Sequence, residues 1–400
     1  MTKLLEAPIA SRIALAVVIL LVSLNLRPAI TGVGPVLEFI RADTGLSALL
    51  AGALTAIPLL AFALMSPLAP ALGAKFGIER AIFVALLLLA LGILLRSVPS
   101  VAALYAGSAM LAAAITIGNV LVPGLIKRDF PDKIGLMTSV YATTLATSAS
   151  ISSGIAVPLA GALPGGWRGS LAVWCIPAII TALLLLPRLR KTTKPVATPS
   201  ASIVQNVWRS KLAWNVTLFM GLQSMSFYVV LSWLSSILQE QGYSPAAAGA
   251  ITALFPALGI PIGIIFPAVL ARFADQRGLT VFFSAMMCVG YAGMIFWPQF
   301  VIAWVAISGL ALGFCFPLAL AFFALRAHDT KQASALSGMA QSIGYGIAAA
   351  GPILFGALHD ATHGWIVPLW MLVIAAVAQG FVGYSAGRKA HVGDKSDARV

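Results

Sequence analysis

Long apolar runs separated by short polar segments make up most of the chain from residue 12 to residue 386. A run of about 20 apolar residues has the length that an α-helix needs to cross the hydrocarbon core of a bilayer. Because such runs recur throughout the 400 residues, the pattern predicts an all-α polytopic membrane protein with twelve transmembrane helices. The predicted spans are 12–35, 46–71, 80–97, 101–124, 136–160, 169–187, 212–238, 246–271, 279–297, 300–325, 333–357 and 365–386.

The first predicted span carries a basic residue and a proline near its centre. Arg27 is followed directly by Pro28, within LNLRPAITGVGP at 24–35. A guanidinium keeps its proton, and it costs about 2.5 to 3.5 kcal/mol at the centre of an inserted helix. Pro28 removes a backbone donor and disfavours helical angles at Arg27, so we expect the helix to loosen at the depth where carriers bind solute. The alternative is an arginine that snorkels or bonds to carbonyl groups of a neighbouring helix.

Composition and charge agree with this class and indicate an orientation. The chain is 60% hydrophobic and 9% charged, with a mean hydropathy of +0.98, which is too apolar for a soluble protein of this size. Arg41, Arg96 and Arg168 fall at one set of span ends, whereas the other basic residues, Arg27 apart, fall at the ends shared by both termini. We therefore expect both termini in the cytoplasm, and we assign the net charge of +13 to topology and not to nucleic-acid binding.

The two halves of the chain repeat each other at a constant offset of 197 residues. GLSALLAGALTAI begins at Gly45 and GYSPAAAGAITAL at Gly242, while PALGAKFG begins at Pro70 and PAVLARFA at Pro267. Both copies run from an outer loop through a helix to a basic inner loop, so the repeats share one orientation.

This repeat predicts two parallel six-helix bundles. We expect the first at residues 1–187 and the second at 212–400, the latter including a short cytoplasmic tail. Residues 188–211 form the expected cytoplasmic linker, because this basic stretch is rich in Pro, Ser and Thr.

The loop PALGAKFGIER at 70–80 resembles the loop between the second and third helices of the major facilitator superfamily. Parallel six-helix repeats fit the architecture of that superfamily as well. The position that is acidic in the superfamily is Ala74 here and Ala271 in the second copy. The resemblance implies a role for both loops in conformational gating, carried by Lys75, Gly77, Arg80, Arg272 and Arg277.

Two glycine- and proline-containing stretches resemble an antiporter motif of the same superfamily. They read SGIAVPLAG at 153–161 and AAAGPILFG at 348–356. Their small residues also favour a simpler interpretation, in which neighbouring helices approach closely.

Four further stretches resemble the branch of the superfamily that contains cyanate and 2-nitroimidazole porters, with the 2-nitroimidazole exporters as the closer group. They are RPAITGVGP at 27–35, GNVLVPGLIKRDFP at 118–131, WRSKLAW at 208–214 and SGMAQSIGYGIAAAGP at 337–352. The similarity covers nearly the whole chain. It implies that Arg27 lies near a small anionic or nitro-bearing solute.

Polar side chains near mid-depth are the candidates for solute contact, because in the superfamily helices 1, 4, 7 and 10 line the cavity and helices 2, 5, 8 and 11 contribute. Arg27 and Thr31 share a face if the helix continues past Pro28, whereas Asn25 would point nearly opposite. The candidates are Arg27, Thr31, Asn25, Asn119, Tyr141, Gln223, Tyr228, Gln341 and Tyr345.

Several of these candidates have a second interpretation. Asn119 can contact solute or bond to a neighbouring helix, and the polar stripe that begins at Tyr141 and continues through Thr144, Ser148 and Ser152 faces either the cavity or another helix. Ser224 lies on the same face as Tyr228. Four aromatic residues could form an apolar wall or pack in the core: Phe227, Trp233, Phe314 and Phe316.

Together these features predict a secondary active transporter that works by alternating access. We expect it to move a small anionic or nitroheteroaromatic solute, such as 2-nitroimidazole or cyanate, across the bacterial inner membrane, with export as the expected direction. The alternative is a broad-specificity efflux carrier for neutral apolar drugs, which would not need Arg27. All 12 carboxylates lie in loops or at span ends, so we expect pH dependence to come from the solute, or coupling to another anion.

Enzymatic and metal chemistry are not expected. The chain has no phosphate-cradling Walker sequence and no nucleophile or acid–base group gathered within its spans. His359 and His363 have helical ligand spacing but fall in an expected outer loop, and the three cysteines are isolated. We therefore expect no metal and no cofactor. The expected partners are the solute and the lipid bilayer, with no nucleic acid, and the expected form is a monomer.

Overall fold

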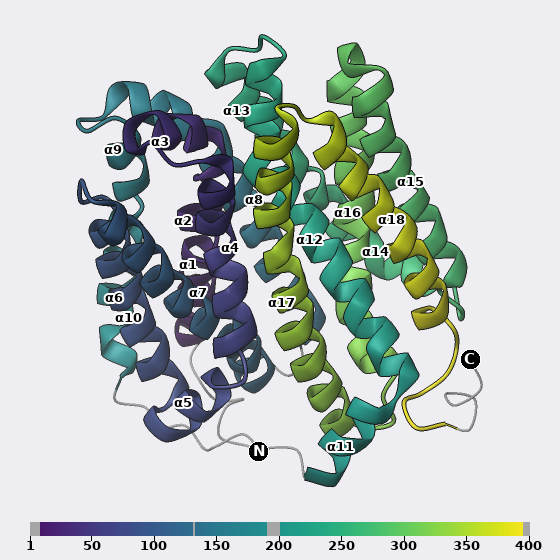
Figure 1. Cartoon of the computed structure of the whole chain (residues 1–400). Helices are drawn as coiled ribbons and strands as arrows, with labels where there is room; N and C mark the ends of the chain where they lie inside the picture. Colours follow the sequence, from purple (N-terminus) through teal and green to yellow (C-terminus); the bar gives the residue numbers. More distant parts are fainter. Residues whose placement is uncertain (1–8, 131–132, 190–200, 395–400) are drawn as a thin grey trace.

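Helices are the regular structure of the described chain, which comprises residues 9–130, 133–189 and 201–394 of the computed structural model. Within these residues, twelve helical stretches are long and apolar enough to cross a membrane, and no strand occurs. Figure 1 shows these stretches as a single bundle of elongated helices. The predicted fold class is confirmed.

The described residues up to 189 contain twelve elements. They are α1 (Ile9–Asn25), α2 (Pro28–Thr31), η2 (Gly34–Val36), α3 (Leu37–Thr44), α4 (Ala48–Met65), α5 (Ala69–Phe76), α6 (Ile78–Arg96), α7 (Val101–Asp129), α8 (Ile134–Ala162), α9 (Trp167–Ala172), α10 (Cys175–Leu185) and η4 (Leu186–Arg188).

The described residues from 201 onward contain nine elements. They are α11 (Ala201–Arg209), α12 (Lys211–Glu240), α13 (Pro245–Ala257), α14 (Gly259–Leu270), α15 (Arg277–Phe296), η5 (Pro298–Phe300), α16 (Val301–Leu325), α17 (Thr330–Thr362) and α18 (Ile366–Ala386). We call residues 9–189 the first half and residues 201–394 the second half. Residues 190–200 of the expected linker lie outside the described residues, so the proposed domain boundaries remain predictions.

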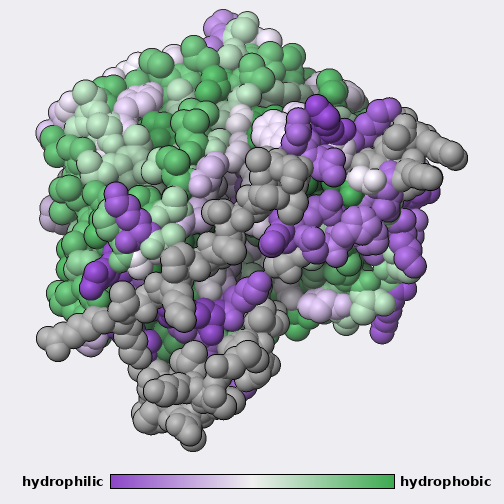
Figure 2. Space-filling model, turned by 90° about the horizontal axis from the view of Figure 1, so that it is seen from below, coloured by the Kyte–Doolittle hydropathy of each residue, from purple (hydrophilic) through white to green (hydrophobic). Residues whose placement is uncertain are grey.

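The bundle has two ends that differ in polarity. We call the end where α1 begins and α18 ends the inner end, which is the lower end in Figure 1, and the opposite end the outer end. Seen from the inner end, hydrophilic side chains gather on part of the face, and hydrophobic side chains lie along much of its edge (Figure 2). This is the surface that a membrane-spanning bundle needs, because lipid surrounds only its flanks.

The sequence repeat reappears in the backbone. Gly45 and Gly242, 197 residues apart, both have positive φ angles, of 71° and 91°, which a residue with a side chain rarely adopts. Two residues later, Ser47 and Ser244 each accept a hydrogen bond at the start of a helix, from the backbone N–H of Leu50 and of Ala247. The matching sequences therefore begin α4 and α13 in the same way.

The first membrane span is broken at Arg27, as its sequence predicts. Helix α1 ends at Asn25, Arg27 has φ −122° and ψ −42°, and α2 begins at Pro28. Helix α2 then ends at Thr31, so the carbonyl of Ala29 lacks the bond from the N–H of Val33 that a continuous α-helix would give it. Here the N–H of Val33 bonds instead to the carbonyl oxygen of Ile30, at 3.3 Å.

The two halves approach most closely toward the outer end, where glycines allow backbone contact. Helix α4 packs along α17, and α8 packs along α13. A Cβ atom added at Gly52 would overlap the carbonyl oxygen of Pro352, and one added at Gly356 would overlap that of Ala48. The interpretation of 348–356 as a close-packing stretch is therefore confirmed.

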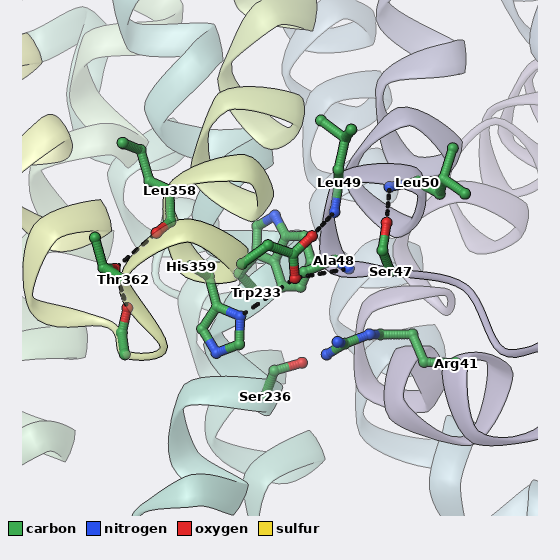
Figure 3. Close-up of polar contacts among 12 residues, drawn as sticks. Arg41, Ser47, Ala48, Leu49, Leu50, Trp233, Ser236, Leu358, His359 and Thr362 are labelled. Atoms are coloured by element: carbon green, nitrogen blue, oxygen red, sulfur yellow. Dashed lines mark hydrogen bonds and ion pairs between the residues drawn. The ribbon is translucent and has the colours of Figure 1, made fainter.

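Polar contacts join the halves at the same end. On α17, Asp360 accepts hydrogen bonds from the backbone N–H groups of Ala48, at 3.2 Å, and Leu49, at 2.8 Å, at the start of α4 (Figure 3). The Ser236 hydroxyl donates to Oε1 of Glu38 at 2.7 Å. A carboxylate at a helix N-terminus is favourable because the unpaired N–H groups carry partial positive charge. We call these contacts and the glycine contacts above the outer gate, which is closed in this structure.

Candidate functional site

A cavity of about 520 Å³ lies between the two halves and contains Arg27. It extends from Arg27, at the break between α1 and α2, to Thr138 near the inner end of α8 and Leu320 near the inner end of α16. The outer gate lies beyond Arg27 toward the other end of the bundle. The cavity is therefore blocked on the outer side and extends toward the inner side.

Tyrosines from three helices surround the charge of Arg27. The Nη1 group of Arg27 donates a hydrogen bond of 2.8 Å to the hydroxyl of Tyr228 on α12. Tyr141 on α8 and Tyr345 on α17 lie near the guanidinium as well. Tyr345 lines the cavity and packs edge to face against Phe62, with ring centroids 5.1 Å apart. Neutral hydroxyls bond to the guanidinium without cancelling its charge.

Carboxylates do not appear among the described residues that line this cavity. Its polar groups besides Arg27 include Gln223 and Ser224 on α12, and Nε2 of Gln223 donates to Oγ of Ser224 at 2.7 Å. Of the sequence candidates, the structure thus brings Arg27, Gln223, Tyr228 and Tyr345 to one cavity. A solute there meets one fixed positive charge and several neutral hydrogen-bonding groups.

Asn25 and Thr31 lie away from the cavity. The Nδ2 group of Asn25 donates to the hydroxyl of Thr181 on α10 at 2.9 Å. Thr31 is fully buried, and its hydroxyl lies 2.5 Å from that of Ser152 on α8. Helix α2 continues from Pro28 to Thr31, and the N–H of Thr31 bonds to the carbonyl oxygen of Arg27 at 3.0 Å, but the Thr31 hydroxyl contacts α8 and does not line the cavity. The structure gives both residues helix-packing contacts, which corrects their expected place in the cavity.

Asn119 and Gln341 also have partners outside the cavity lining. The Tyr141 hydroxyl donates to Oδ1 of Asn119 at 3.2 Å, which joins α7 to α8. Nε2 of Gln341 donates to the hydroxyl of Ser337, one turn earlier on α17, at 2.8 Å. Tyr141 thus remains a neighbour of the Arg27 charge, whereas Asn119 and Gln341 are bonded to other helix residues.

The apolar wall of the cavity comes mainly from the second half. Phe227 and Phe316 line the cavity, as the sequence suggests, but Trp233 and Phe314 do not. Trp233 is fully buried and donates to the carbonyl oxygen of Pro352 at 3.1 Å, and Phe314 stacks on Phe283 with centroids 4.0 Å apart.

Two wall features could not be assigned from the sequence. Phe255 and Phe266 line the cavity, and the span that contains them breaks at Leu258, between α13 and α14. Gly259 follows this break and lies against Gly313 of α16, where an added Cβ would come 3.0 Å from the Gly259 Cα. Pro256 and Gly259 are the local signals for such a break, but they do not indicate which side chains then face the cavity.

The two basic loops at the inner end have the following contacts. Gly77 joins α5 to α6 with φ 88°, a conformation that favours glycine. Lys75 lies over the Phe76 ring, 5.3 Å from its centroid, and Nε of Arg80 donates to the carbonyl oxygen of Leu189 at 3.0 Å. In the second copy, Arg272 is exposed, while Arg277 lies 3.6 Å from the carboxylate of Asp275.

Near these loops, a polar contact joins the third membrane span of each half to the fourth. These spans are α6 and α7 in the first half and α15 and α16 in the second half. Nη2 of Arg128 contacts Oε1 of Glu79 at 2.6 Å. The residue 197 positions after Glu79 is Gln276, which accepts a hydrogen bond from Arg326. These contacts lie within the halves, so they hold each bundle together and do not join one bundle to the other.

The two histidines with helical ligand spacing have other contacts, and a different group of side chains lies close together at the inner end. Nε2 of His359 lies 3.1 Å from Glu240, and His363 ends α17 with φ 52°. In the part of the chain that the structure describes, His328, His391 and Asp394 offer three ligand atoms within 4.8 Å of one another. They lie at the inner end, outside the cavity. The N–H of His391 donates to the Asp394 carboxylate, which lowers the pKa of Asp394.

Comparison with known proteins places the chain among membrane transporters. The sequence profile of the Major Facilitator Superfamily matches residues 14–349. The chain is 42% identical to the 2-nitroimidazole transporter of Escherichia coli over 381 residues, which covers 94% of this chain and 96% of that protein. It is 28% identical to the cyanate transport protein of the same organism, which covers 88% and 91%.

The fold agrees with these sequence matches. A bacterial homologue of the human lysosomal transporter Spinster, solved in an inward-facing and unoccupied conformation, superposes with a TM-score of 0.78 at 15% identity, covering 95% of this chain and 98% of that one. The sequence profile spans more than half of the chain, and the E. coli relative matches nearly all of it. The chain therefore belongs to the major facilitator superfamily and is a multi-pass transporter of small solutes, not an enzyme.

Proposed function

We propose that this transporter exports a small anionic or nitroheteroaromatic solute, of the class of cyanate and 2-nitroimidazole, across the bacterial inner membrane. The observation that carries the proposal is the position of Arg27 at the outer limit of the cavity, among neutral tyrosines and without a lining carboxylate. The two relatives with these substrates in their names are consistent with a solute that carries negative charge or nitro oxygens.

The magnitudes favour an anion at this position. An inserted arginine costs about 2.5 to 3.5 kcal/mol at a helix centre. Opposite unit charges about 4 Å apart attract by roughly 4 kcal/mol at an effective dielectric constant of about 20. A bound anion therefore offsets the cost of the buried cation. A neutral tyrosine cannot offset as much, because it contributes only a hydrogen bond to a charged group, about 1.5 to 3 kcal/mol.

The closed outer gate suggests how the carrier works. Solute enters the cavity from the inner end, and rocking of one half against the other then separates α4 from α17 and opens the outer end. We place the inner end in the cytoplasm, because most basic residues lie there. The gating residues in this proposal are Lys75, Gly77, Arg80, Arg272 and Arg277, at the inner loops where the rocking halves would meet. The cavity lies within one chain, so we propose that a monomer is sufficient.

A second candidate function follows from the aromatic wall. Phe227, Phe255, Phe266 and Phe316 give the cavity a large apolar surface. Such a surface suits a broad efflux carrier for neutral apolar drugs. That function would not depend on Arg27, and this difference separates the two candidates.

Counterflow in proteoliposomes tests the proposed cargo. Vesicles with the wild-type protein, preloaded with unlabelled solute, should accumulate labelled cyanate or labelled 2-nitroimidazole. Arg27→Gln vesicles should not, and Asn25→Ala vesicles, changed outside the cavity, should retain uptake. Accumulation of a neutral apolar drug that is equal in wild type and Arg27→Gln, without accumulation of either proposed cargo, would instead support the second candidate.

A further inference from the structure

A second arginine is buried near the break in the first span. Arg96 is the last residue of α6, at the outer end, yet only 2% of its surface is exposed. Its Nη1 donates at 2.5 Å to the carbonyl oxygen of Ala29, which has no helical partner because α2 ends at Thr31. Its Nε and Nη2 atoms are buried and have no hydrogen-bond partner. Two charged donors of this side chain thus remain unused.

Arg96 lines a small hollow that is separate from the large cavity. The hollow lies on the outer side of Tyr228, which lines both spaces. Its other polar residues are Thr55 and Ser108 from the first half and Ser232 from the second half. No carboxylate is found among the described residues that line it.

The size of the hollow restricts what it can hold. Its volume of about 20 Å³ compares with the roughly 10 to 15 Å³ that one water molecule needs. A single water molecule or a monatomic anion fits, whereas a nitroheterocycle does not. A water molecule would bond to the free N–H groups but would leave the charge of this buried side chain uncompensated. A halide satisfies both requirements, because N–H and hydroxyl groups donate to it.

We propose that this hollow binds a chloride-sized inorganic anion between Arg96 and the neighbouring hydroxyls while the outer gate is closed. The site is built from both halves, since Ser232 and Tyr228 belong to the second half and Arg96 to the first. Opening of the outer gate separates these residues, so the bound anion favours the outer-closed state and leaves toward the outer side. The inference does not depend on the cargo assigned to Arg27.

Halide titration of purified protein tests the site. The thermal unfolding midpoint is measured in bromide and in gluconate at equal ionic strength, because gluconate is too large for the hollow. Bromide should raise the midpoint of the wild type in a saturable way. It should do the same for Arg27→Gln, since Arg27 faces the other space. In Arg96→Gln, the response should be lost or require at least tenfold more bromide.

Arg96→Gln also alters the bond to Ala29, so a second variant keeps the test decisive if this protein does not fold. Ser232→Val leaves Arg96 in place but replaces a hydroxyl of the hollow with a methyl group and adds a second methyl group, and it too should lose the bromide response. The proposal is overturned if bromide does not stabilise the wild type, if Ser232→Val responds like the wild type, or if Arg27→Gln alone abolishes the response. The last outcome would place the halide at Arg27 and leave the proposed function standing.

Discussion

The guanidinium of Arg27 and the hydroxyl of Tyr228 form a 2.8 Å hydrogen bond between the two halves of the transporter, at the outer limit of the central cavity. The two residues are 201 positions apart, so only the packing of α12 against the broken first span brings them together. An arriving anion must share this guanidinium with Tyr228.

Replacement of Tyr228 by phenylalanine should therefore strengthen anion binding. The change removes the acceptor that competes for Nη1 of Arg27, and a hydrogen bond to a charged group contributes about 1.5 to 3 kcal/mol. We expect cyanate to bind about tenfold more tightly, measured by calorimetry on purified protein. Tyr345→Phe is the matched control, because Tyr345 lines the same cavity whereas the hydrogen bond from Arg27 goes to Tyr228. Weaker binding in Tyr228→Phe would show that this hydroxyl donates to the solute.

The glycines of the outer gate should control its closure. A Cβ at Gly356 would overlap the carbonyl oxygen of Ala48, so Gly356→Ala should hold the outer end open. The measurement is the rate at which a membrane-impermeant maleimide labels Leu231→Cys, in a protein whose three native cysteines are replaced by alanine. Leu231 is buried beside Gly34 in the closed state, so labelling should be much faster in Gly356→Ala.

A second glycine of the same helix provides the control for this measurement. Gly346, also on α17, has no atom within 4 Å of an added Cβ, so Gly346→Ala should label at the wild-type rate. Equal rates in Gly356→Ala and Gly346→Ala would mean that this backbone contact does not limit closure.

Asp360 should stabilise the start of α4 across the interface. Asparagine at this position retains one acceptor oxygen but loses the second acceptor and the negative charge at a helix N-terminus. We expect Asp360→Asn to speed hydrogen–deuterium exchange of the Ala48 and Leu49 amides several-fold, which corresponds to about 1 kcal/mol. Asp329→Asn, at the start of α17, should leave these two amides unchanged, because Asp329 caps its own helix. Similar exchange rates of these amides in both variants would show that Asp360 does not stabilise the outer gate.

The lining of the cavity also predicts how binding depends on pH. No carboxylate or histidine occurs among the described lining residues, and arginine stays protonated. The affinity for an anion that remains ionised, such as nitrate, should therefore be constant between about pH 5 and pH 8, the range in which histidine and perturbed groups titrate. Calorimetric titrations across this range provide the measurement. A change of tenfold or more would reveal a titrating group that acts on the site.

The sequence was sufficient for the spans, the repeat and the break at Arg27, because each of these depends on local pattern. Hydropathy locates a helix, matching stretches locate a repeat, and Pro28 disturbs the residue before it. The rotation of each helix about its own axis was harder to predict from the sequence. Thr31 follows the break, and its direction depends on how α2 is set against α8.

Arg96 illustrates a second limit of prediction from the sequence, which concerns contacts between distant residues. Hydropathy places it at a span end beside Ser97, where arginine is ordinarily solvated. In the structure it is buried and donates to the carbonyl of Ala29, which the irregular first span leaves without a helical partner. A contact between residues 67 positions apart leaves no local pattern that a single sequence reveals.

Calorimetric binding of cyanate to the purified wild type, Arg27→Lys and Arg27→Gln proteins tests the central claim most directly. The account predicts that Arg27→Gln lowers the affinity by about 100-fold and Arg27→Lys by about tenfold, because lysine keeps the charge but lacks the planar fork of donors. Affinities that are equal in all three folded proteins would contradict it.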